Sequence, residues 1–450
     1  MKNSIAAFVF AFSLASGPAG ASPLNDGLAA FNRQDYPRAL ELLRPLAEQG
    51  NTDAQSTLGE MYQWGKGVAQ NDAEAVKWYR PAAEKGDRYA QSNLGFLLEK
   101  GRGTPQDYVE AVKWFQLAAQ QGSKAAQDNL GVMYANGRGV PLDKAEAVKW
   151  FRMSAEQGYV LGQLDLGDAY YLGHGIAQDL DKAAYWYELA AKQGNADGQF
   201  GFGRSLATGT PRRAKDFAGA LKWYQLAADG GNLAAMNNLG VMYEKGDGVK
   251  QDYAEAFRLY QIAAEKNDAL AQANIGVMYY EGRGVGRNYA EALKWSLPAA
   301  EKGEKTAQTT LGILYRRGEG VKQDDVEALK WFKLAAEQGD PHAQAMLGFM
   351  YDQGKGVARN KAEAIRLYRS AALLGHSNAQ SNLGLKFFAG DGVPKSLVRA
   401  YVWLSLASEG GDKIAARELK SLSKAMTPNQ SFEGSAALLR CQFSKLKDCN

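Results

Sequence analysis

The chain offers few side chains whose types and spacing could perform chemistry. Its only histidines are His174, His342 and His376, which are far apart in the sequence. A metal site needs several such ligands brought to one point, and these three fall at unrelated positions of the repeating pattern described below. We therefore expect no common metal site.

Serine and carboxylate motifs are equally weak. S-x-x-K occurs at residues 421–424 and 444–447, but neither K-T-G nor S-D-N accompanies it. Acidic pairs such as Asp107 and Glu110 recur at predicted helix starts, where carboxylates stabilise the helix dipole. The G-x-G triplets follow predicted helices and lack the full G-x-G-x-x-G pattern, so we interpret them as turns. The sequence predicts no catalytic residue, no metal ligand and no cofactor.

Both cysteines, Cys441 and Cys449, lie near the end of the chain. In an oxidising compartment they predict a disulfide, with two free thiols as the alternative. On an uninterrupted helix, residues eight apart lie ~12 Å apart along the axis, which is beyond disulfide reach. If the two cysteines pair, the chain between them must turn back on itself.

The elements that would position any site come from a cassette that recurs ten times between Asn51 and Gly411. It has the form A-Q-x-x-L-G-x-M-Y-x-x-G-x-G-V, followed by E-A-x-K-W-Y-x-x-A-A-E-x-G. Its Leu-Gly step falls at Leu58, Leu94, Leu130, Leu166, Phe202, Leu239, Ile275, Leu311, Leu347 and Leu383. Every interval is 36 residues except the one that ends at Leu239, which is 37. A fixed period of this size predicts a solenoid of identical units.

Each cassette predicts two amphipathic helices. Apolar residues recur at helical spacing from Ala54 in the first half of a repeat and from Ala75 in the second half. A glycine such as Gly65 follows the first helix, where a left-handed cap favours a residue without Cβ. A tryptophan column is predicted to be core rather than a ligand-stacking surface: Trp78, Trp114, Trp150, Trp186, Trp223, Trp295, Trp331 and Trp403. The expected fold is an all-α, α/α superhelical solenoid of about ten 36-residue repeats.

Stacked repeats share one core, so we expect a single array over residues 51–411. Residues 22–50 predict an N-terminal capping half-repeat with Ala39, Leu43 and Leu46 on its core face. Residues 412–450 predict a C-terminal helical cap and tail. The fifth copy carries an irregular basic loop at residues 209–215, interpreted as either a partner contact or a solvated insertion.

Composition and the first residues bear on localisation. A formal charge of +4 over 450 residues lacks the basic excess of a nucleic-acid binder. Residues 1–21 combine Lys2, an apolar run and small residues before Ala21, which predicts a cleaved secretory signal peptide. The alternative is a transmembrane anchor, but the apolar run is about half as long as the ~20 residues that a membrane-spanning helix needs. We expect an exported chain, periplasmic or secreted, without membrane insertion after cleavage.

With these motifs, residues 51–411 resemble the Sel-one-like repeat (SLR) family, which is related to the tetratricopeptide repeats. The resemblance implies an α/α superhelix that acts as an adaptor or scaffold for other proteins. Exported members are similar to factors in signalling, envelope assembly, polysaccharide export and host interaction. Some secreted relatives carry a disulfide in each repeat and are linked to β-lactam binding, but this chain has no cysteine in any repeat.

The face of the first helix opposite its core varies between copies, which points to a binding stripe. By analogy with related solenoids this stripe lines the concave surface; the alternative is partial packing against neighbouring helices. The candidate protein-binding residues are Tyr89, Phe96, Leu164, Asp168, Tyr171, Arg204, Val241, Val277, Tyr280, Ile313, Arg316, Phe349 and Phe388.

Three functions follow as hypotheses. The first is a non-enzymatic, exported scaffold that binds a protein or peptide in its groove, in envelope assembly, signalling or host interaction. The second is a weak β-lactam or peptidoglycan-related activity, against which the missing nucleophile motifs argue. The third is a structural partner in exopolysaccharide secretion. The sequence leaves the partner, the pathway and the oligomeric state open.

Overall fold

The computed structural model describes residues 22–447 and residue 449. The predicted signal peptide lies outside these residues. Within them the chain forms 24 α-helices and no strand, with one isolated bridge between Thr210 and Arg213. The helices divide into two compact units, with the boundary between Ala214 and Lys215. This boundary lies within the irregular loop of the fifth copy.

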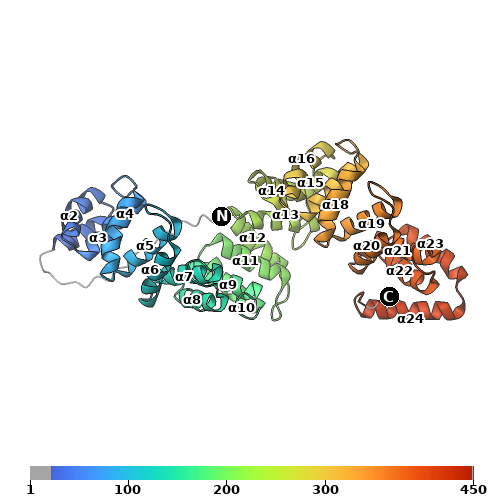
Figure 1. Ribbon diagram of the computed structural model, residues 1–450, viewed down its shortest axis with the longest axis horizontal. Coiled ribbons are helices and arrows are strands. Elements are labelled where there is room, and N and C mark those ends of the chain that lie inside the picture. The colour runs from blue at the N-terminus through green and yellow to red at the C-terminus, as the bar shows by residue number, and fades with distance from the viewer. Residues whose placement is uncertain (1–21, 448, 450) are drawn as a thin grey trace. The chain divides into compact units, whose positions relative to one another are not determined.

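We call the first helix of each repeat its A helix and the second its B helix (Figure 1). The A helices of the first unit are α1 (Pro23–Asn32), α3 (Thr52–Trp64), α5 (Arg88–Lys100), α7 (Lys124–Asn136), α9 (Val160–Leu172) and α11 (Ala196–Thr208). Its B helices are α2 (Tyr36–Glu48), α4 (Asp72–Glu84), α6 (Tyr108–Gln120), α8 (Lys144–Glu156) and α10 (Leu180–Lys192).

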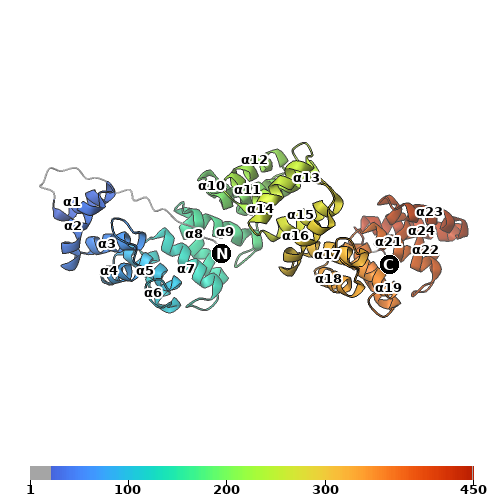
Figure 2. The same cartoon turned by 90° about the horizontal axis from the view of Figure 1, so that it is seen from above.

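The second unit begins with a B helix (Figure 2). Its A helices are α13 (Leu233–Lys245), α15 (Ala269–Glu281), α17 (Lys305–Arg317), α19 (Pro341–Gln353), α21 (Ser377–Ala389) and α23 (Lys413–Ala425). Its B helices are α12 (Phe217–Asp229), α14 (Tyr253–Glu265), α16 (Tyr289–Glu301), α18 (Asp325–Glu337), α20 (Lys361–Leu373), α22 (Leu397–Glu409) and α24 (Pro428–Phe443).

Polar residues and glycines set the ends of these helices. Asp107 is the N-cap of α6, and its carboxylate accepts from the backbone N–H of Glu110 at 2.8 Å. Gly65 ends α3 in the left-handed conformation, as the sequence predicted, and so do the matching glycines of every copy but the fifth. There Gly209 has φ 73° and ψ 169°, so the left-handed cap is missing. The chain then enters the irregular loop instead of the usual turn.

The A and B helices of a repeat approach closely through a glycine on the A helix, except in the fifth copy, where α11 packs on α10 of the preceding repeat. A Cβ on Gly59 would lie 2.5 Å from the Tyr79 ring, and one on Gly312 would lie 2.5 Å from Phe332. Both rings are fully buried. One core cluster extends from Ala75 to Met133 and so joins successive repeats without a break.

The tryptophan column is less buried than the sequence suggested. Trp331 and Trp403 are buried, whereas Trp114 and Trp150 are half-buried at the edge of the core. The residue after each tryptophan faces the A-helix glycine instead, as Tyr79 and Phe115 do. This second column, which is aromatic except at Ser296 and Leu404, lies at the centre of the helix pairs.

Both ends of the chain close the core. In the N-terminal pair, Ala39 and Leu43 are fully buried and Leu46 is half-buried. At the other end Cys441 and Cys449 are joined by a disulfide, with their Cα atoms 4.5 Å apart. The chain turns back between them, because α24 ends at Phe443 and Lys445 and Leu446 both have positive φ.

Candidate functional site

The predicted binding stripe lies on the A helices, and within each unit neighbouring A helices contact one another, as α7 does with α9 and α15 with α17. This packing buries part of the stripe. Leu164 is 6% exposed and Ile313 is 8% exposed, so these two belong to the core and their assignment to a binding surface is corrected.

The other stripe residues are half-buried. They are Tyr89, Phe96, Asp168, Tyr171, Arg204, Val241, Val277, Tyr280, Arg316, Phe349 and Phe388. Phe96 packs against the cluster of the second and third copies, and Phe349 packs against the C-terminal cluster. The stripe is thus an inter-repeat seam with one accessible edge.

In the first unit the stripe forms a connected cluster around Arg204. The Arg204 guanidinium stacks 3.8 Å from the centre of the Tyr171 ring and lies 5.5 Å from that of Phe200. It also donates to the Tyr187 hydroxyl at 3.2 Å, and that hydroxyl donates to Asp168 at 2.6 Å. Burial, followed by the Asp168 charge, raises the pKa of Tyr187. These contacts join side chains of α9, α10 and α11, although the Nε atom of Arg204 has no hydrogen-bond partner within the described residues.

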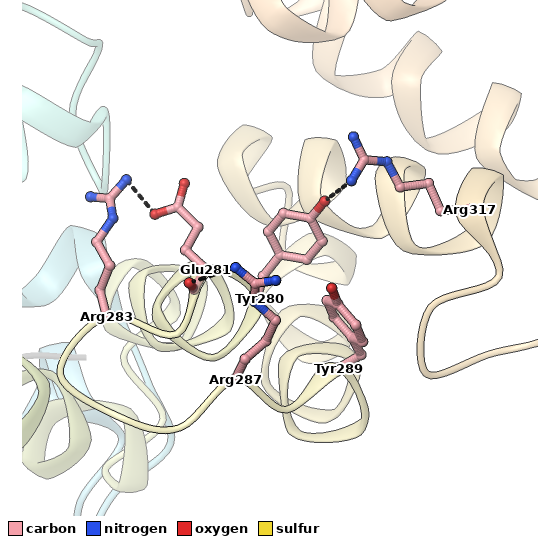
Figure 3. A pocket seen from close by; sticks show the side chains of 6 residues that line it. All are labelled: Tyr280, Glu281, Arg283, Arg287, Tyr289 and Arg317. Atoms are coloured by element: carbon pink, nitrogen blue, oxygen red, sulfur yellow. Dashed lines mark hydrogen bonds and ion pairs between the residues drawn. The ribbon is translucent and has the colours of Figure 1, made fainter.

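The second unit has an open cleft at the end of α15. It measures about 420 Å³ and is lined by Tyr280, Glu281, Arg283, Arg287, Tyr289 and Arg317 (Figure 3). Tyr280 is a stripe residue of α15, Arg317 ends the next A helix α17, and Tyr289 starts α16. Arg283 and Arg287 come from the turn between α15 and α16. Three elements and one turn therefore place three guanidinium groups beside two aromatic rings.

Each arginine of the cleft is held differently. Arg317 donates to the Tyr280 hydroxyl at 2.8 Å, and its guanidinium is 3.8 Å from the Glu319 carboxylate. Arg283 pairs with Glu244 at 3.0 Å and, more closely, with Glu281 (Figure 3). Arg287 donates to the Glu281 backbone carbonyl at 3.3 Å and is exposed. No ion pair within the described residues involves Arg287, so its charge is the one least neutralised.

The chemistry of this cleft favours an anionic group on an extended ligand. Arginine donates two parallel hydrogen bonds to a carboxylate, and an open cleft leaves room for a second such contact. Tyr280 and Tyr289, whose ring centres are 5.6 Å apart, supply apolar area beside the charges. Of these residues, only Tyr280 belongs to the predicted stripe. The missed signal was the second arginine of the turn, Arg287, which stands where the second and sixth copies carry Gln106 and Gln251.

Elsewhere on the stripe, Arg316 points to the next repeat. Its guanidinium lies 5.6 Å from the Phe349 ring centre, and burial, followed by the Arg317 charge, lowers its pKa. In the basic loop, Arg213 stacks 5.3 Å from the Phe202 ring centre and pairs with Glu188 at 3.7 Å. Arg212 is the more exposed of the two loop arginines.

Two histidines that lie 34 positions apart in the sequence, His342 and His376, are neighbours in the second unit. The rings of His342 and His376 have centres 5.4 Å apart. Across residues 22–447 and 449, no three His, Cys, Asp or Glu side chains gather as a metal site would require. None of the helices that begin at Pro23 or later combines the length and apolarity of a membrane span.

Comparisons with known proteins identify the type of repeat. The family model described as Sel1 repeat matches residues 28–51, 52–87, 88–123, 124–159, 160–195, 196–232, 233–268, 269–304, 306–340, 341–376 and 377–412. The first of these matches covers most of the predicted N-terminal half-repeat. A comparison with curated proteins found no match.

Two solved structures are similar over most or half of the chain. One is c5321, a protective antigen present in uropathogenic Escherichia coli strains that displays an SLR fold. It is 33% identical, with a TM-score of 0.55 over 91% of this chain and 96% of that one. A Sel1 repeat protein from Oxalobacter formigenes is 32% identical, with a TM-score of 0.50 over 54% of this chain and 97% of that one. The eleven matched segments and these likenesses agree with the helix pairs of the fold: the chain belongs to the Sel1 repeat family.

Proposed function

We propose that this chain is an exported, non-enzymatic scaffold whose cleft at α15, α16 and α17 holds an acidic segment of a partner protein. Sel1-repeat solenoids typically mediate protein–protein interaction. The observation that carries the proposal is the convergence of Arg283, Arg287 and Arg317 beside Tyr280 and Tyr289. Arg283 is paired with Glu244 and Glu281, and Arg317 lies 3.8 Å from Glu319, so Arg287 is the cation of the cleft without an ion pair within the described residues.

The three arginines of the cleft differ in their ion pairs and in their exposure. Arg283 is held by two carboxylates and orients the turn. Arg287 and Arg317 are exposed and have donors left for a ligand. We expect the partner to present Asp or Glu residues near an aromatic or apolar side chain, which would lie on Tyr280 and Tyr289.

Export is part of the proposal and rests on residues 1–21. Lys2, the apolar run and the small residues before Ala21 form a signal of the secretory kind, cleaved after Ala21. The Cys441–Cys449 disulfide supports an oxidising compartment, because disulfides persist there. Envelope assembly, signalling and host interaction are all compatible with such a scaffold.

The binding test uses the full mature chain and a fluorescent peptide that contains Glu and Tyr, with a Gln-for-Glu peptide as reference. We expect Arg287→Gln combined with Arg317→Ala to weaken binding of the acidic peptide at least about tenfold, since a charge-assisted hydrogen bond contributes about 1.5–3 kcal/mol. Affinity is measured by fluorescence anisotropy.

Arg359→Gln is the matched control, since Arg359 occupies the same turn position two repeats later and donates to the Asp352 backbone carbonyl at 2.7 Å. It should leave binding unchanged. Equal affinity for the acidic and the Gln-containing peptides, or equal losses in the control and the double variant, would show that the cleft is not the binding site.

A further inference from the structure

The outer face of α24 carries an apolar stripe whose three large side chains are exposed and whose fourth member, Ala436, is half-buried. Phe432 is 78% exposed, Leu439 is 54% exposed and Phe443 is 85% exposed. Together with Ala436 they fall within ~60° of one another around the helix, at 100° per residue. Figure 1 shows α24 along the edge of the second unit.

The opposite face of the same helix is the one that packs on the protein. Gly434 and Cys441 are buried, and a Cβ on Gly434 would lie 2.9 Å from the Tyr401 ring of α22. Leu438 packs against the C-terminal core cluster. Because this inner face and the disulfide already fix the helix, the outer apolar stripe is not required to hold α24 in place.

The spacing of the stripe is palindromic. Its members follow one another at intervals of 4, 3 and 4 residues. An antiparallel copy of the same helix would therefore place Phe432 against Phe443 and Ala436 against Leu439, and the reverse pairs would form equally. This is the alternation by which antiparallel helices fill a shared apolar seam, and a two-fold interface requires such self-complementarity.

We propose that α24 pairs in an antiparallel manner with α24 of a second copy of this chain, through the stripe Phe432, Ala436, Leu439 and Phe443. The mature protein is then a two-fold dimer joined at its C-terminal caps. The partner subunit offers the same stripe, so no other protein is needed to cover it.

Charges beside the stripe fit this arrangement. Glu433 and Arg440 lie on the same flank of the stripe, one helical position beyond Phe432 and Leu439. In the antiparallel pair Glu433 faces Arg440 of the partner subunit, and the two-fold axis creates this contact twice. Both side chains are exposed, and no ion pair within the described residues involves either. On the other flank, Gln442 already donates to Glu409 at 2.9 and 3.1 Å.

One helix pair is a small interface, below the ~1,200 Å² of a stable complex, so the dimer should be weak. The experiment is therefore sedimentation of the full mature chain over roughly 5–200 µM, the range of a micromolar dissociation constant. We expect a reversible monomer–dimer equilibrium within this range.

Three variants test the seam and its register. Phe432→Ser combined with Phe443→Ser should weaken dimerisation at least about tenfold, because four buried phenyl rings are lost per dimer. Glu433→Arg and Arg440→Glu should each weaken it, because like charges then meet twice. An equimolar mixture of these two single variants should associate as tightly as wild type, since the cations of one then face the carboxylates of the other. In a parallel pair residues 433 and 440 would lie at different levels and on opposite sides of the seam, so neither single variant would weaken association.

The matched control is Val109→Ser combined with Val326→Ser, two substitutions on equally exposed helix positions away from α24. It should not change the dimer, and circular dichroism should show the same helicity in every variant. A wild-type chain that remains monomeric throughout would overturn the proposal, as would a dimer unaffected by the phenylalanine variant or a mixture that fails to associate. Monomeric wild type that co-sediments with anionic lipid vesicles would assign the stripe to a membrane surface instead.

Discussion

At the scale of single residues, the buried polar positions between repeats decide where stability depends on pH. Asp128 on α7 is 3% exposed, and its Oδ1 atom has no hydrogen-bond partner within the described residues. Burial, followed by the charge of Asp165, raises its pKa well above the ordinary value. At the equivalent position three repeats on, Asn274 donates to Asn237 at 2.8 Å, so amides occupy the same pair of positions there.

We expect Asp128→Asn to stabilise the first unit at neutral pH. With its raised pKa the folded state keeps a proton that the unfolded chain loses above about pH 4. The free energy of unfolding therefore falls as pH rises through the folded pKa, and the amide removes this loss. The gain at pH 7, about 1.4 kcal/mol for each unit by which the folded pKa is raised, should vanish near pH 4, where the carboxyl is protonated in the folded state and largely protonated in the unfolded state. Thermal melting at both pH values measures it; a gain that is equal at both would contradict the assignment to Asp128.

His376 provides the opposite pH dependence in the second unit. Its Nδ1 atom accepts from the backbone N–H of Ala379 at 3.3 Å and so caps α21. Burial, followed by the nearby His342, lowers its pKa, while Asp340 acts in the other direction. A lowered folded pKa means that stability is fully present above about pH 6.5 and is lost as pH falls below it.

We expect His376→Asn to reduce the loss of stability between about pH 7 and pH 5, because an amide caps a helix at any pH in this range. Asn51 caps α3 in this way, with the N–H of Ala54 donating to its side chain at 3.0 Å. The comparison is His174→Asn, since His174 is exposed. If both variants changed the pH profile of thermal melting equally, the cap at α21 would not be the source.

At the scale of helices, the stripe and the aromatic column differ in how much they stabilise. Phe332 is fully buried against Gly312, so Phe332→Ala should cost about 3–5 kcal/mol. Trp295 is half-buried, and its Nε1 donates to Glu291 at 3.1 Å. We expect Trp295→Ala to lower the free energy of unfolding by less than Phe332→Ala does. Urea unfolding followed by circular dichroism ranks the two, and a larger loss for Trp295→Ala would place the tryptophan column at the centre of the core.

Burial also determines how substitutions in the predicted binding stripe affect stability. If Phe96, Ile313 and Phe349 were free, their combined replacement by Ala would leave melting unchanged. Ile313 is buried, and both phenylalanines pack on core clusters, so we expect the triple variant to lower the melting temperature. Loss of binding in that variant would therefore not locate the partner, whereas the cleft arginines can be changed without disturbing the core.

At the scale of the whole molecule, the loop at residues 209–215 lies at the boundary between the two units and lacks helical structure. Residues 211–216 are all exposed, and the loop contains Arg212, Arg213 and Lys215. Cleavage concentrates where backbone is exposed and irregular. We expect limited trypsin digestion to cut here first and release two resistant fragments, which mass spectrometry would identify by their ends. First cleavage in one of the regular turns, for example at Arg138, would contradict this.

The sequence by itself determined the helix pairs, their ends and the period. Local chemistry carries this information: helical spacing of apolar residues, N-cap carboxylates and amides, and glycines at left-handed positions. A glycine with positive φ also follows the B helices, as Gly86 follows α4 and Gly303 follows α16, and at the equivalent position after α14 Asn267 adopts φ 69° as its side-chain type allows. The division into two units coincides with the only copy whose turn departs from the pattern.

Only the tertiary structure decided which side chains and backbone atoms make contact between neighbouring repeats. The second glycine of each turn is needed because the turn rests on the preceding B helix: a Cβ on Gly284 would lie 2.1 Å from the Tyr253 carbonyl oxygen. The motif glutamine caps the preceding helix, as Gln127 donates to the Ala119 carbonyl at 3.2 Å. The burial of Ile313 and the arginine cleft likewise join residues from different elements. A periodic sequence states which side chains recur, but the distance between a residue and one about 30 positions away depends on how the repeats stack.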